Sequence, residues 1–392
     1  MRYDFETLVK RKYVGSSKWD AMLHIKPDLL DEIIPFSVAD MEFMNAPEVS
    51  EGLAEFIKST VLGYSRPTVA YFDAVIGWMK RRHDFDVKRE WIIGYPGVVP
   101  ALFQLTKHLT SPGDGIIIMP PVYYPFMLAV KNADCKLVEN ELLFQDGRYE
   151  IDFDDLEKKA ERPENKLLIL CSPHNPVGRV WTRIELERVG EICIANNVMV
   201  ISDEIHADLV MPGHKHTMFA SISEEFAKNS IICTAPSKTF NIAGLQSSNI
   251  IIPNDKLRKS CADNKLKQGM MSCNIIAYKA CEIAYNKCGP WLSELLTVLE
   301  ENRKLIKEYI ETNIPVIKVI DLEGTYLQWL DCRGLGLGHQ ELEKIMIDKA
   351  QLFFDEGYIF GSGGEGFERM NIACPSYILK ATLERLKGAV ME

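Results

Sequence analysis

The chain has 392 residues, of which 47% are hydrophobic and 26% are charged, and 45 basic against 55 acidic side chains give a formal net charge of −10. This length predicts a large domain with a smaller companion, or two domains of similar size. The negative charge argues against a nucleic-acid partner, which would require a dominant basic surface. We find neither an apolar N-terminal region nor a stretch of membrane-spanning length, so we expect a cytoplasmic protein with no membrane partner.

The ten cysteines contain no C-x-x-C pair, and many lie in apolar runs, which is typical of buried, reduced thiols. We therefore expect no disulfide framework. His206, His214 and His216 lie close together, but a loop with proline and glycine separates them and no acidic or thiol ligand is regularly spaced beside them. A surface loop is the favoured interpretation and no metal ion is expected, with a metal site as the alternative.

The N-terminal region, residues 1–43, mixes aromatic and acidic residues and is interpreted as an extended arm. An amphipathic helix is expected next, because Val49, Leu53 and Ile57 recur at helical spacing. Residues 70–82 also carry apolar positions at this spacing and predict a second helix.

From residue 91 the pattern changes to short apolar runs divided by turns and helical stretches. The predicted strands are residues 91–94, 115–119, 136–139, 167–171, 198–202, 231–233 and 249–252. Because hydrophobic and polar residues do not alternate in these runs, we expect strands buried on both faces of a mostly parallel sheet. The chain is therefore predicted to be an α/β protein with a central sheet sandwiched by helices.

The last third of the chain has a different pattern. Residues 275–285 and 291–311 are helical, too long for one more crossover, and are expected to link two domains. Three further strands and two helices are predicted at residues 316–320, 325–330, 370–373, 341–349 and from 378 onward. The predicted large α/β domain is residues 48–285, and the small α+β domain combines residues 286–392 with the arm, residues 1–47.

Chemically informative side chains follow several of the predicted strands. Tyr123, Asn175, Asp203 and Lys238 each come shortly after one of them. Because the carboxyl ends of parallel strands meet at one edge of a sheet, these side chains are expected to converge there. Taken singly, Asp203 is explained as a helix N-cap, Asn175 as a turn former and Tyr123 as packing. Because all four side chains follow predicted strands, explaining each one separately would require four coincidences.

Lys238 stands among small hydroxylated and apolar residues in a turn after a short apolar strand. A lysine held against apolar neighbours loses solvation of its ammonium form, which lowers the pKa and frees the amine to form Schiff bases with carbonyls. The alternative is a lysine that merely extends to solvent. The neighbouring acid, amide and aromatic side chains favour the first interpretation.

The cofactor that needs this set of residues is pyridoxal 5′-phosphate. Its aldehyde reacts with a lysine, its ring nitrogen requires a carboxylate, its phenolate oxygen accepts from an amide, and its ring stacks on an aromatic side chain. Its phosphate requires backbone amides at a helix N-terminus. Gly97, Val98 and Val99, directly before a helical run, supply such amides.

Three segments resemble fold-type I pyridoxal-phosphate enzymes of the class I/II aminotransferase superfamily: SPHNPVGRVW at residues 172–181, SDEIH at 202–206 and APSKTFNIAGLQ at 235–246. Five more resemble the MalY/PatB-type cystathionine β-lyases, also called C-S lyases: VADMEF at 38–43, GYSRP at 63–67, PGDG at 112–115, PPVYYP at 120–125 and FERMNIACP at 367–375. The resemblance spans nearly the whole chain.

The resemblance implies a role for each residue that would contact the ring. Lys238 would be the Schiff-base lysine and, once displaced by substrate, the base that removes the Cα proton. Asp203 would hold the ring nitrogen in its protonated form. Asn175 would donate to the phenolate oxygen, with His206 nearby, and Tyr123 would stack on the ring.

The resemblance also implies the phosphate and substrate contacts. The amides of residues 97–99 and Ser237 would bind the phosphate, and Tyr64 would reach it from the second subunit of a homodimer with a shared active site. Arg369 would bind the α-carboxylate of an amino-acid substrate through a bidentate fork, and Asp40 is also assigned to substrate binding.

Two positions depart from the aminotransferase pattern. Gln246 stands eight residues after the lysine, where many aminotransferases have a phosphate-binding arginine, and Ala235 stands three residues before it, where a serine is common. Phosphate binding is therefore expected to depend on Thr234, Ser237 and the helix N-terminus.

The function implied by the resemblance is a lyase of methionine and cysteine metabolism. It would convert cystathionine or cysteine S-conjugates to pyruvate, ammonia and a thiol such as homocysteine. A class I/II aminotransferase would use the same residues and is the alternative, although the motifs near Asp40 and Tyr64 favour the lyase. A pyridoxal-phosphate protein that acts only by binding a regulatory partner is less favoured because the lysine, aspartate and arginine are intact, and a nicotinamide oxidoreductase is a distant fourth.

Overall fold

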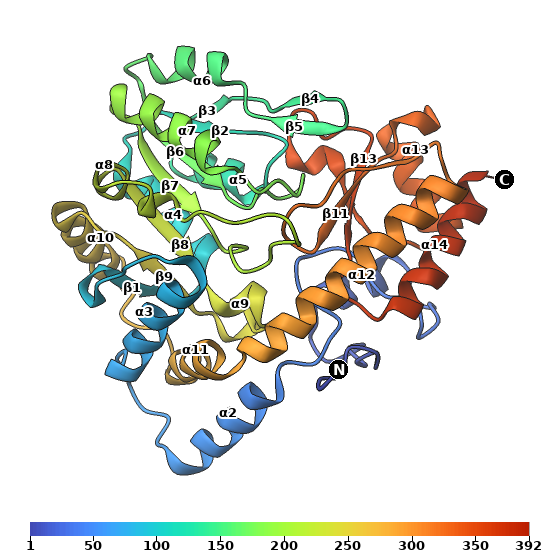
Figure 1. The fold of residues 1–392 in the computed structure, drawn as a ribbon, viewed down its shortest axis with the longest axis horizontal. Helices are drawn as coiled ribbons and strands as arrows, with labels where there is room; N and C mark the ends of the chain where they lie inside the picture. The colour runs from blue at the N-terminus through green and yellow to red at the C-terminus, as the bar shows by residue number, and fades with distance from the viewer. Residues whose placement is uncertain (392) are drawn as a thin grey trace.

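The computed structural model describes residues 1–391 and contains a central seven-stranded sheet (Figure 1). Its strands, in the order β1-β9-β8-β7-β6-β2-β3, are β1 (Ile92–Tyr95), β9 (Ser248–Ile251), β8 (Ser230–Thr234), β7 (Met199–Asp203), β6 (Asn165–Cys171), β2 (Gly115–Ile118) and β3 (Lys136–Glu139). Only β9 runs antiparallel to its neighbours, and the remaining pairs are parallel. The predicted mostly parallel sheet is confirmed.

Both faces of this sheet are covered by helices, which explains why the strands read as continuous apolar runs. Ile116 of β2 packs in the apolar cluster that includes α4 (Val98–Leu109), whereas the next residue, Ile117, packs in the cluster that includes α7 (Arg183–Ala195). The other helices that cover these faces are α5 (Pro125–Asn132) and α10 (Asp255–Lys267) beside α4, and α6 (Phe153–Ala160) and α8 (Glu224–Lys228) beside α7. The predicted α/β sandwich is therefore correct.

Three further helices lie at the β1 edge of the molecule. They are α2 (Pro47–Ser59), α3 (Val69–His83) and α11 (Ile275–Lys287), and α11 packs against both of the others. A short hairpin of β4 (Leu143–Gln145) and β5 (Arg148–Glu150), which we did not predict, projects from the opposite end.

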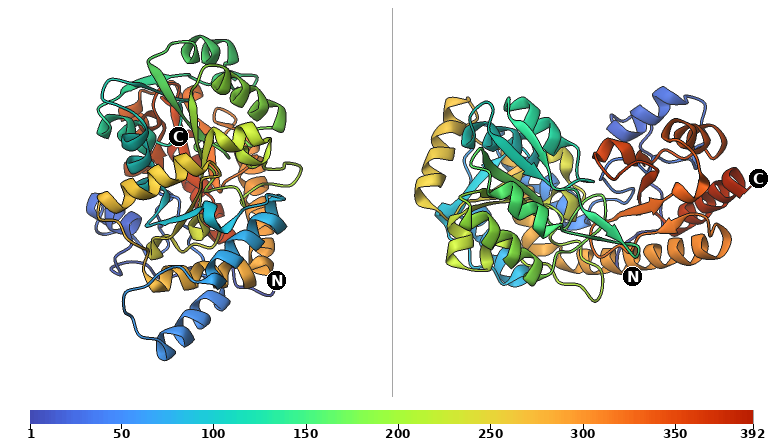
Figure 2. Two further views of the ribbon diagram at one scale, coloured as in Figure 1. Left: turned by 90° about the vertical axis from the view of Figure 1, so that its left-hand side faces the viewer. Right: turned by 90° about the horizontal axis from the view of Figure 1, so that it is seen from above.

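A second, four-stranded antiparallel sheet lies on the right in Figure 1. It has the order β10 (Lys318–Val319), β11 (Leu327–Asp331), β13 (Phe367–Asn371) and β12 (Asp355–Glu356). The helices of this part are α12 (Gly289–Asn313), α13 (His339–Lys344) with a π-helical continuation at Ile345–Lys349, and α14 (Ser376–Met391). In the right-hand view of Figure 2, α12 passes along both parts of the molecule.

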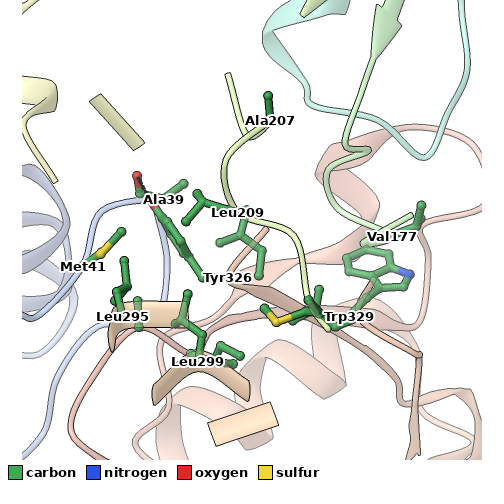
Figure 3. Packing of buried hydrophobic residues seen from close by; sticks show 14 of the residues in the cluster. Ala39, Met41, Val177, Ala207, Leu209, Leu295, Leu299, Tyr326 and Trp329 are labelled. Atoms are coloured by element: carbon green, nitrogen blue, oxygen red, sulfur yellow. Dashed lines mark hydrogen bonds between the residues drawn. The ribbon is translucent and has the colours of Figure 1, made fainter. Parts of the chain in front are cut away.

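One apolar cluster joins the two sheets. In Figure 3, Tyr326, which directly precedes β11, lies between Ala39 and Leu209 on one side and Leu295 and Leu299 of α12 on the other. All five residues belong to the same buried cluster. The predicted domain boundaries near residues 47 and 285 remain a prediction, because this core is continuous across them.

The extended arm that we predicted for residues 1–43 is wrong in one segment. Residues Ser17–Ile25 form helix α1, whose Trp19 and Met22, three positions apart and therefore on one helical face, are buried. Two apolar residues in a short segment are too few to reveal helical periodicity in the sequence. The rest of the arm reaches the small sheet, where the amide of Asn371 donates to the carbonyl of Phe36 at 2.9 Å.

No helix within residues 1–391 combines the length and apolar character needed to cross a bilayer. Every cysteine is free, and all but Cys135 are buried.

Candidate active site

A cavity lies beyond the carboxyl ends of β6, β7 and β8, between the two sheets. Ten of the predicted site residues line it: Gly97, Val98, Val99, Tyr123, Asn175, Asp203, His206, Ser237, Lys238 and Arg369. They come from the carboxyl ends of three strands (β2, β6 and β7), the start of α4, the short helix α9 (Pro236–Thr239) and β13. The expected convergence of strand-end residues therefore occurs, while Asp40 and Tyr64 lie outside this cavity.

Lys238 lies on α9 with its amine turned into the cavity. Its Nζ donates a 2.6 Å hydrogen bond to the carbonyl oxygen of Ala39, which also accepts from the hydroxyl of Tyr326 at 2.9 Å. Burial lowers the pKa of the Lys238 amine to about 8, against the opposing attraction of Asp40. An amine with this pKa exchanges its proton near neutral pH.

Asp203, the last residue of β7, is buried and nearly unpaired. Within residues 1–391 its carboxylate accepts one hydrogen bond, from the amide of Ile205 at 3.2 Å. Burial raises the pKa of this carboxyl to about 7, and the nearby Lys238 opposes the shift. A buried carboxylate that lines a cavity and forms no salt bridge within residues 1–391 fits a ligand that brings a protonated ring nitrogen.

Asn175, His206 and Tyr123 complete the part of the cavity suited to a flat ring. Oδ1 of Asn175 accepts from Arg369, so its Nδ2 group, which makes no hydrogen bond within residues 1–391, is free to donate. His206 is buried, and Nδ1 of its ring has no hydrogen-bond partner among the described residues. Burial lowers the pKa of His206 to about 3, which keeps the ring neutral. Tyr123 contacts the ring of Tyr124 at 5.5 Å between centroids.

The N-terminus of α4 forms the end of the cavity suited to a phosphate. Gly97 is the N-cap with φ +127°, a conformation that favours glycine, and a Cβ there would lie 3.3 Å from Pro100. The amides of Val98 and Val99 open the helix and have no intrahelical acceptor, so they present positive partial charge to an anion.

The hydroxyl groups near the N-terminus of α4 are not the ones that we expected from the sequence. Thr234 donates to the carbonyl of Asn249 at 3.1 Å and does not line the cavity. Ser247, which we did not predict, lines the cavity beside Gln246, and its buried Oγ has no hydrogen-bond partner among residues 1–391. Ser247 directly follows Gln246, which stands where many aminotransferases have a phosphate-binding arginine. This neighbouring position was the signal in the sequence that could have pointed to Ser247. The unpaired donors of this cradle fit the phosphate of pyridoxal 5′-phosphate.

Arg369 lies on β13 and lines the cavity. Its Nη1 donates to Asn175 Oδ1 at 2.8 Å, its Nη2 donates to Asp355 Oδ2, and its buried Nε has no acceptor in the part of the chain that the structure describes. The guanidinium also lies over the ring of Phe360, 4.8 Å from its centroid. Asp355 lines the cavity as well, and no motif in the sequence pointed to it.

Asp40 does not line the cavity. Its carboxylate pairs with Arg11 at 2.9 Å and with Lys18 at 2.9 Å, although the preceding residues, Val38 and Ala39, do line the cavity. These two cations hold the pKa of Asp40 below its usual range despite burial. The predicted substrate contact of Asp40 remains a prediction, and its observed contacts hold the segment that carries the Ala39 carbonyl.

Tyr64 lies in the loop after α2, and its side chain is fully exposed. It borders a separate surface groove together with Pro96 and Lys265, and Pro96 also lines the main cavity. Tyr64 therefore makes no contribution to the cavity within a single chain.

Two of the histidines that suggested a metal alternative have other positions or contacts, because His206 lines the cavity and His216 is paired with a carboxylate. His216 pairs with Glu204 at 2.7 Å, and residues 1–391 contain no group of three or more His, Cys, Asp or Glu side chains that could hold a metal ion.

Comparisons with known proteins agree with this geometry. The family model described as aminotransferase class I and II matches residues 31–386. The chain is 42% identical to cystathionine beta-lyase PatB of Bacillus subtilis (strain 168), covering 99% of this chain and 100% of PatB, and 30% identical to protein MalY of Escherichia coli (strain K12), covering 99% of each. The structure of cystalysin from Treponema denticola, which contains a pyridoxal 5′-phosphate cofactor, is similar with a TM-score of 0.98 and 51% identity, covering 100% of this chain and 99% of cystalysin.

The matches extend over nearly the full length of both partners, so they include the segments that carry every cavity residue. The resemblance that the sequence motifs indicated is thereby confirmed. The chain belongs to the aminotransferase class I and II family, and within it to the group that includes PatB and MalY.

Proposed function

We propose that this protein is a pyridoxal 5′-phosphate-dependent C-S lyase that eliminates a thiol from cystathionine or related cysteine S-conjugates, with pyruvate and ammonia as the other products. One observation carries the proposal: Lys238, Asp203 and Arg369 line a single cavity, and Arg369 is the only arginine among the described residues that line it. Its likeness to PatB, a cystathionine beta-lyase, supports the same reaction. An aminotransferase for dicarboxylic amino acids would need a second cation for the distal carboxylate.

The proposed cofactor contacts follow from the unpaired groups in the cavity. Asp203 would hold the ring nitrogen, Asn175 would donate to the phenolate oxygen and Tyr123 would pack on the ring. The N-terminus of α4 and Ser237 would hold the phosphate, and His206 would lie beside the ring. When bound, pyridoxal phosphate supplies a conjugated system that stabilises negative charge at the substrate Cα.

The reacting groups of the chain have separate tasks. Arg369 binds the substrate α-carboxylate and so orients the Cα–H bond. The Lys238 amine, with its pKa lowered to about 8, takes the Cα proton as a general base. Loss of that proton allows the thiolate to leave from Cβ. The low-dielectric surroundings of Asp203 strengthen its interaction with a positive ring nitrogen.

The partner assignments belong to the same proposal. The protein is a cytoplasmic homodimer, in which the exposed hydroxyl of Tyr64 reaches the phosphate of the second subunit's site. The full exposure of Tyr64, with Val61 and Leu62 also exposed beside it, supports a contact surface for another chain there.

Cystathionine is expected to yield pyruvate, ammonia and homocysteine in equal amounts, because Arg369 binds the α-carboxylate and Lys238 takes the Cα proton, and elimination needs no second cation for a distal carboxylate. Aspartate or alanine with a keto acid should transfer an amino group slowly or not at all. The measurement is product stoichiometry on purified holoenzyme, with pyruvate and free thiol assayed beside keto-acid-dependent amino transfer. Amino transfer that outruns pyruvate release from every thioether tested would establish the aminotransferase alternative instead.

A mixture of Tyr64→Phe and Lys238→Ala subunits is expected to regain activity that neither variant has alone. In a two-fold dimer with a shared site, each hybrid has one site with neither lesion. Random exchange makes about half of the dimers hybrids, so the mixture should reach about a quarter of wild-type activity. Activity that stays at the mean of the two variants, while size measurements show that subunits have exchanged, would contradict a shared site.

A further inference from the structure

Asp355 occupies a position in the cavity that the reaction outlined above does not use. It opens β12 and lies opposite Arg369 in the antiparallel register of β12 and β13. Its Oδ2 accepts from Nη2 of Arg369 and, at 3.0 Å, from the amide of Val38. Its Oδ1 makes no hydrogen bond within residues 1–391, and the side chain is only 14% exposed. One carboxylate oxygen is therefore available on the wall of the cavity.

The segment that Asp355 contacts is unusually constrained. Val38 has φ +56°, a left-handed conformation that is rare for a β-branched residue, and it lines the cavity. Nδ2 of Asn371 donates to the Val38 carbonyl at 2.9 Å, so the residue is held from both sides. Strained conformations of this kind persist where the surroundings over-determine them, commonly at ligand sites. The position of the Asp355 carboxylate is thus well defined.

The charges that line the cavity are balanced. Lys238 and Arg369 are the cations, and Asp203 and Asp355 are the anions, among the described lining residues. With the cofactor bound, Lys238 and Asp203 are engaged with it, and Arg369 is committed to the α-carboxylate. A second anionic group on the substrate finds no remaining cation and faces Asp355.

We propose that Asp355 is a specificity-determining residue, which makes this site favour cysteine S-conjugates with a neutral or cationic S-substituent and reject those with an anionic one. The inference rests on the proposed lyase function and names the substrate class of that site. Like-charge juxtaposition in a partly buried site discriminates strongly between partners of similar shape. Cystathionine satisfies this rule, because its distal amino-acid group carries both an ammonium and a carboxylate.

The test uses three substrates of similar size and different charge: S-carboxymethylcysteine, S-carbamoylmethylcysteine and S-aminoethylcysteine. The wild-type holoenzyme should show kcat/KM for the neutral amide on the order of tenfold or more above that for the anionic acid. Asp355→Asn keeps the shape and an acceptor for Arg369 and Val38 but removes the charge. It should reduce the ratio of amide to acid by roughly tenfold, mainly through the KM of the acid, and lower the preference for the cationic substrate.

Glu356→Gln is the matched control, because this neighbouring carboxylate on β12 does not line the cavity. Glu356→Gln should leave the ratios of kcat/KM among the three substrates unchanged. If Asp355→Asn changes kcat/KM of all three substrates by the same factor, Asp355 only positions Arg369 and the specificity role is wrong.

Measurements of substrate binding test the role of Asp355 independently of the proposed lyase function. The dissociation constants of the three compounds are measured from changes in the visible absorbance of the holoenzyme. If no thiol is released from these compounds or from cystathionine, the lyase proposal fails, while a charge order in the dissociation constants that Asp355→Asn abolishes still supports the specificity role. Equal dissociation constants for the acid and the amide in the wild type would overturn it.

Discussion

The Lys238→Ala protein is expected to lose pyruvate release by at least on the order of 10³-fold, because it lacks the base for the Cα proton. It should also lose the covalent link to the cofactor. Borohydride reduction followed by mass spectrometry measures that link directly: the wild-type chain should gain the mass of the cofactor, and the variant should not. Lys304→Ala, which removes an exposed lysine of α12, serves as the control and should behave as the wild type.

The expected loss follows from where the amine is held. Only Lys238 among the lysines of residues 1–391 lines the cavity, so no neighbouring amine can replace it. A variant that keeps both turnover and the covalent mass would show that another residue binds the cofactor. That result would contradict the assignment of the site as a whole.

The Asp203→Asn protein is expected to bind cofactor but to turn over on the order of hundreds-fold more slowly, because a few kcal/mol of transition-state stabilisation would be lost. The amide cannot attract a proton to the ring nitrogen as a carboxylate does. Pyruvate release at saturating cofactor measures the effect, and near-normal turnover would contradict the role.

A second measurement on Asp203→Asn tests the environment of the carboxyl. In the cofactor-free protein, burial raises the pKa of Asp203 from 3.8 to about 7, so the folded state binds this proton more tightly than the unfolded chain. The contribution of Asp203 to the free energy of unfolding is thus fully present below pH 3.8 and is lost as the pH rises through about 7. The Tm of the cofactor-free wild type should therefore fall relative to that of the variant over this range. A constant difference would show that the carboxyl is solvated.

The part of the site built on the large sheet was predictable because a simple rule governs it. Apolar runs reveal buried strands, and polar residues directly after them, such as Asn175, Asp203 and Lys238, share one edge of a parallel sheet. The helix start at Gly97 was predictable for the same reason, since it follows a strand. Local sequence was sufficient because each residue is placed by the strand beside it.

The remaining part of the site depends on contacts between distant segments. Asp355 meets Arg369 through the pairing of β12 and β13, and a two-residue strand such as β12 has no pattern that a sequence could reveal. Asp40 was assigned to the substrate from motif resemblance, while the pairing of its carboxylate with Arg11 and Lys18 depends on the fold of the arm. Tyr64 is exposed in the single chain, so its proposed contact with the phosphate requires a second chain.

The cavity of this thiol-releasing enzyme contains a thiol of its own, on Cys171. Cys171 ends β6 and lines the cavity, where burial, with the charge of Asp203 adding to it, raises the pKa of its thiol far above the usual range. Its sulfur accepts a 3.4 Å hydrogen bond from the amide of Asn175. Since only a thiolate attacks a disulfide, this protonated sulfur is inert toward oxidised forms of the product. The cavity can therefore release sulfur nucleophiles repeatedly without forming mixed disulfides with its own wall.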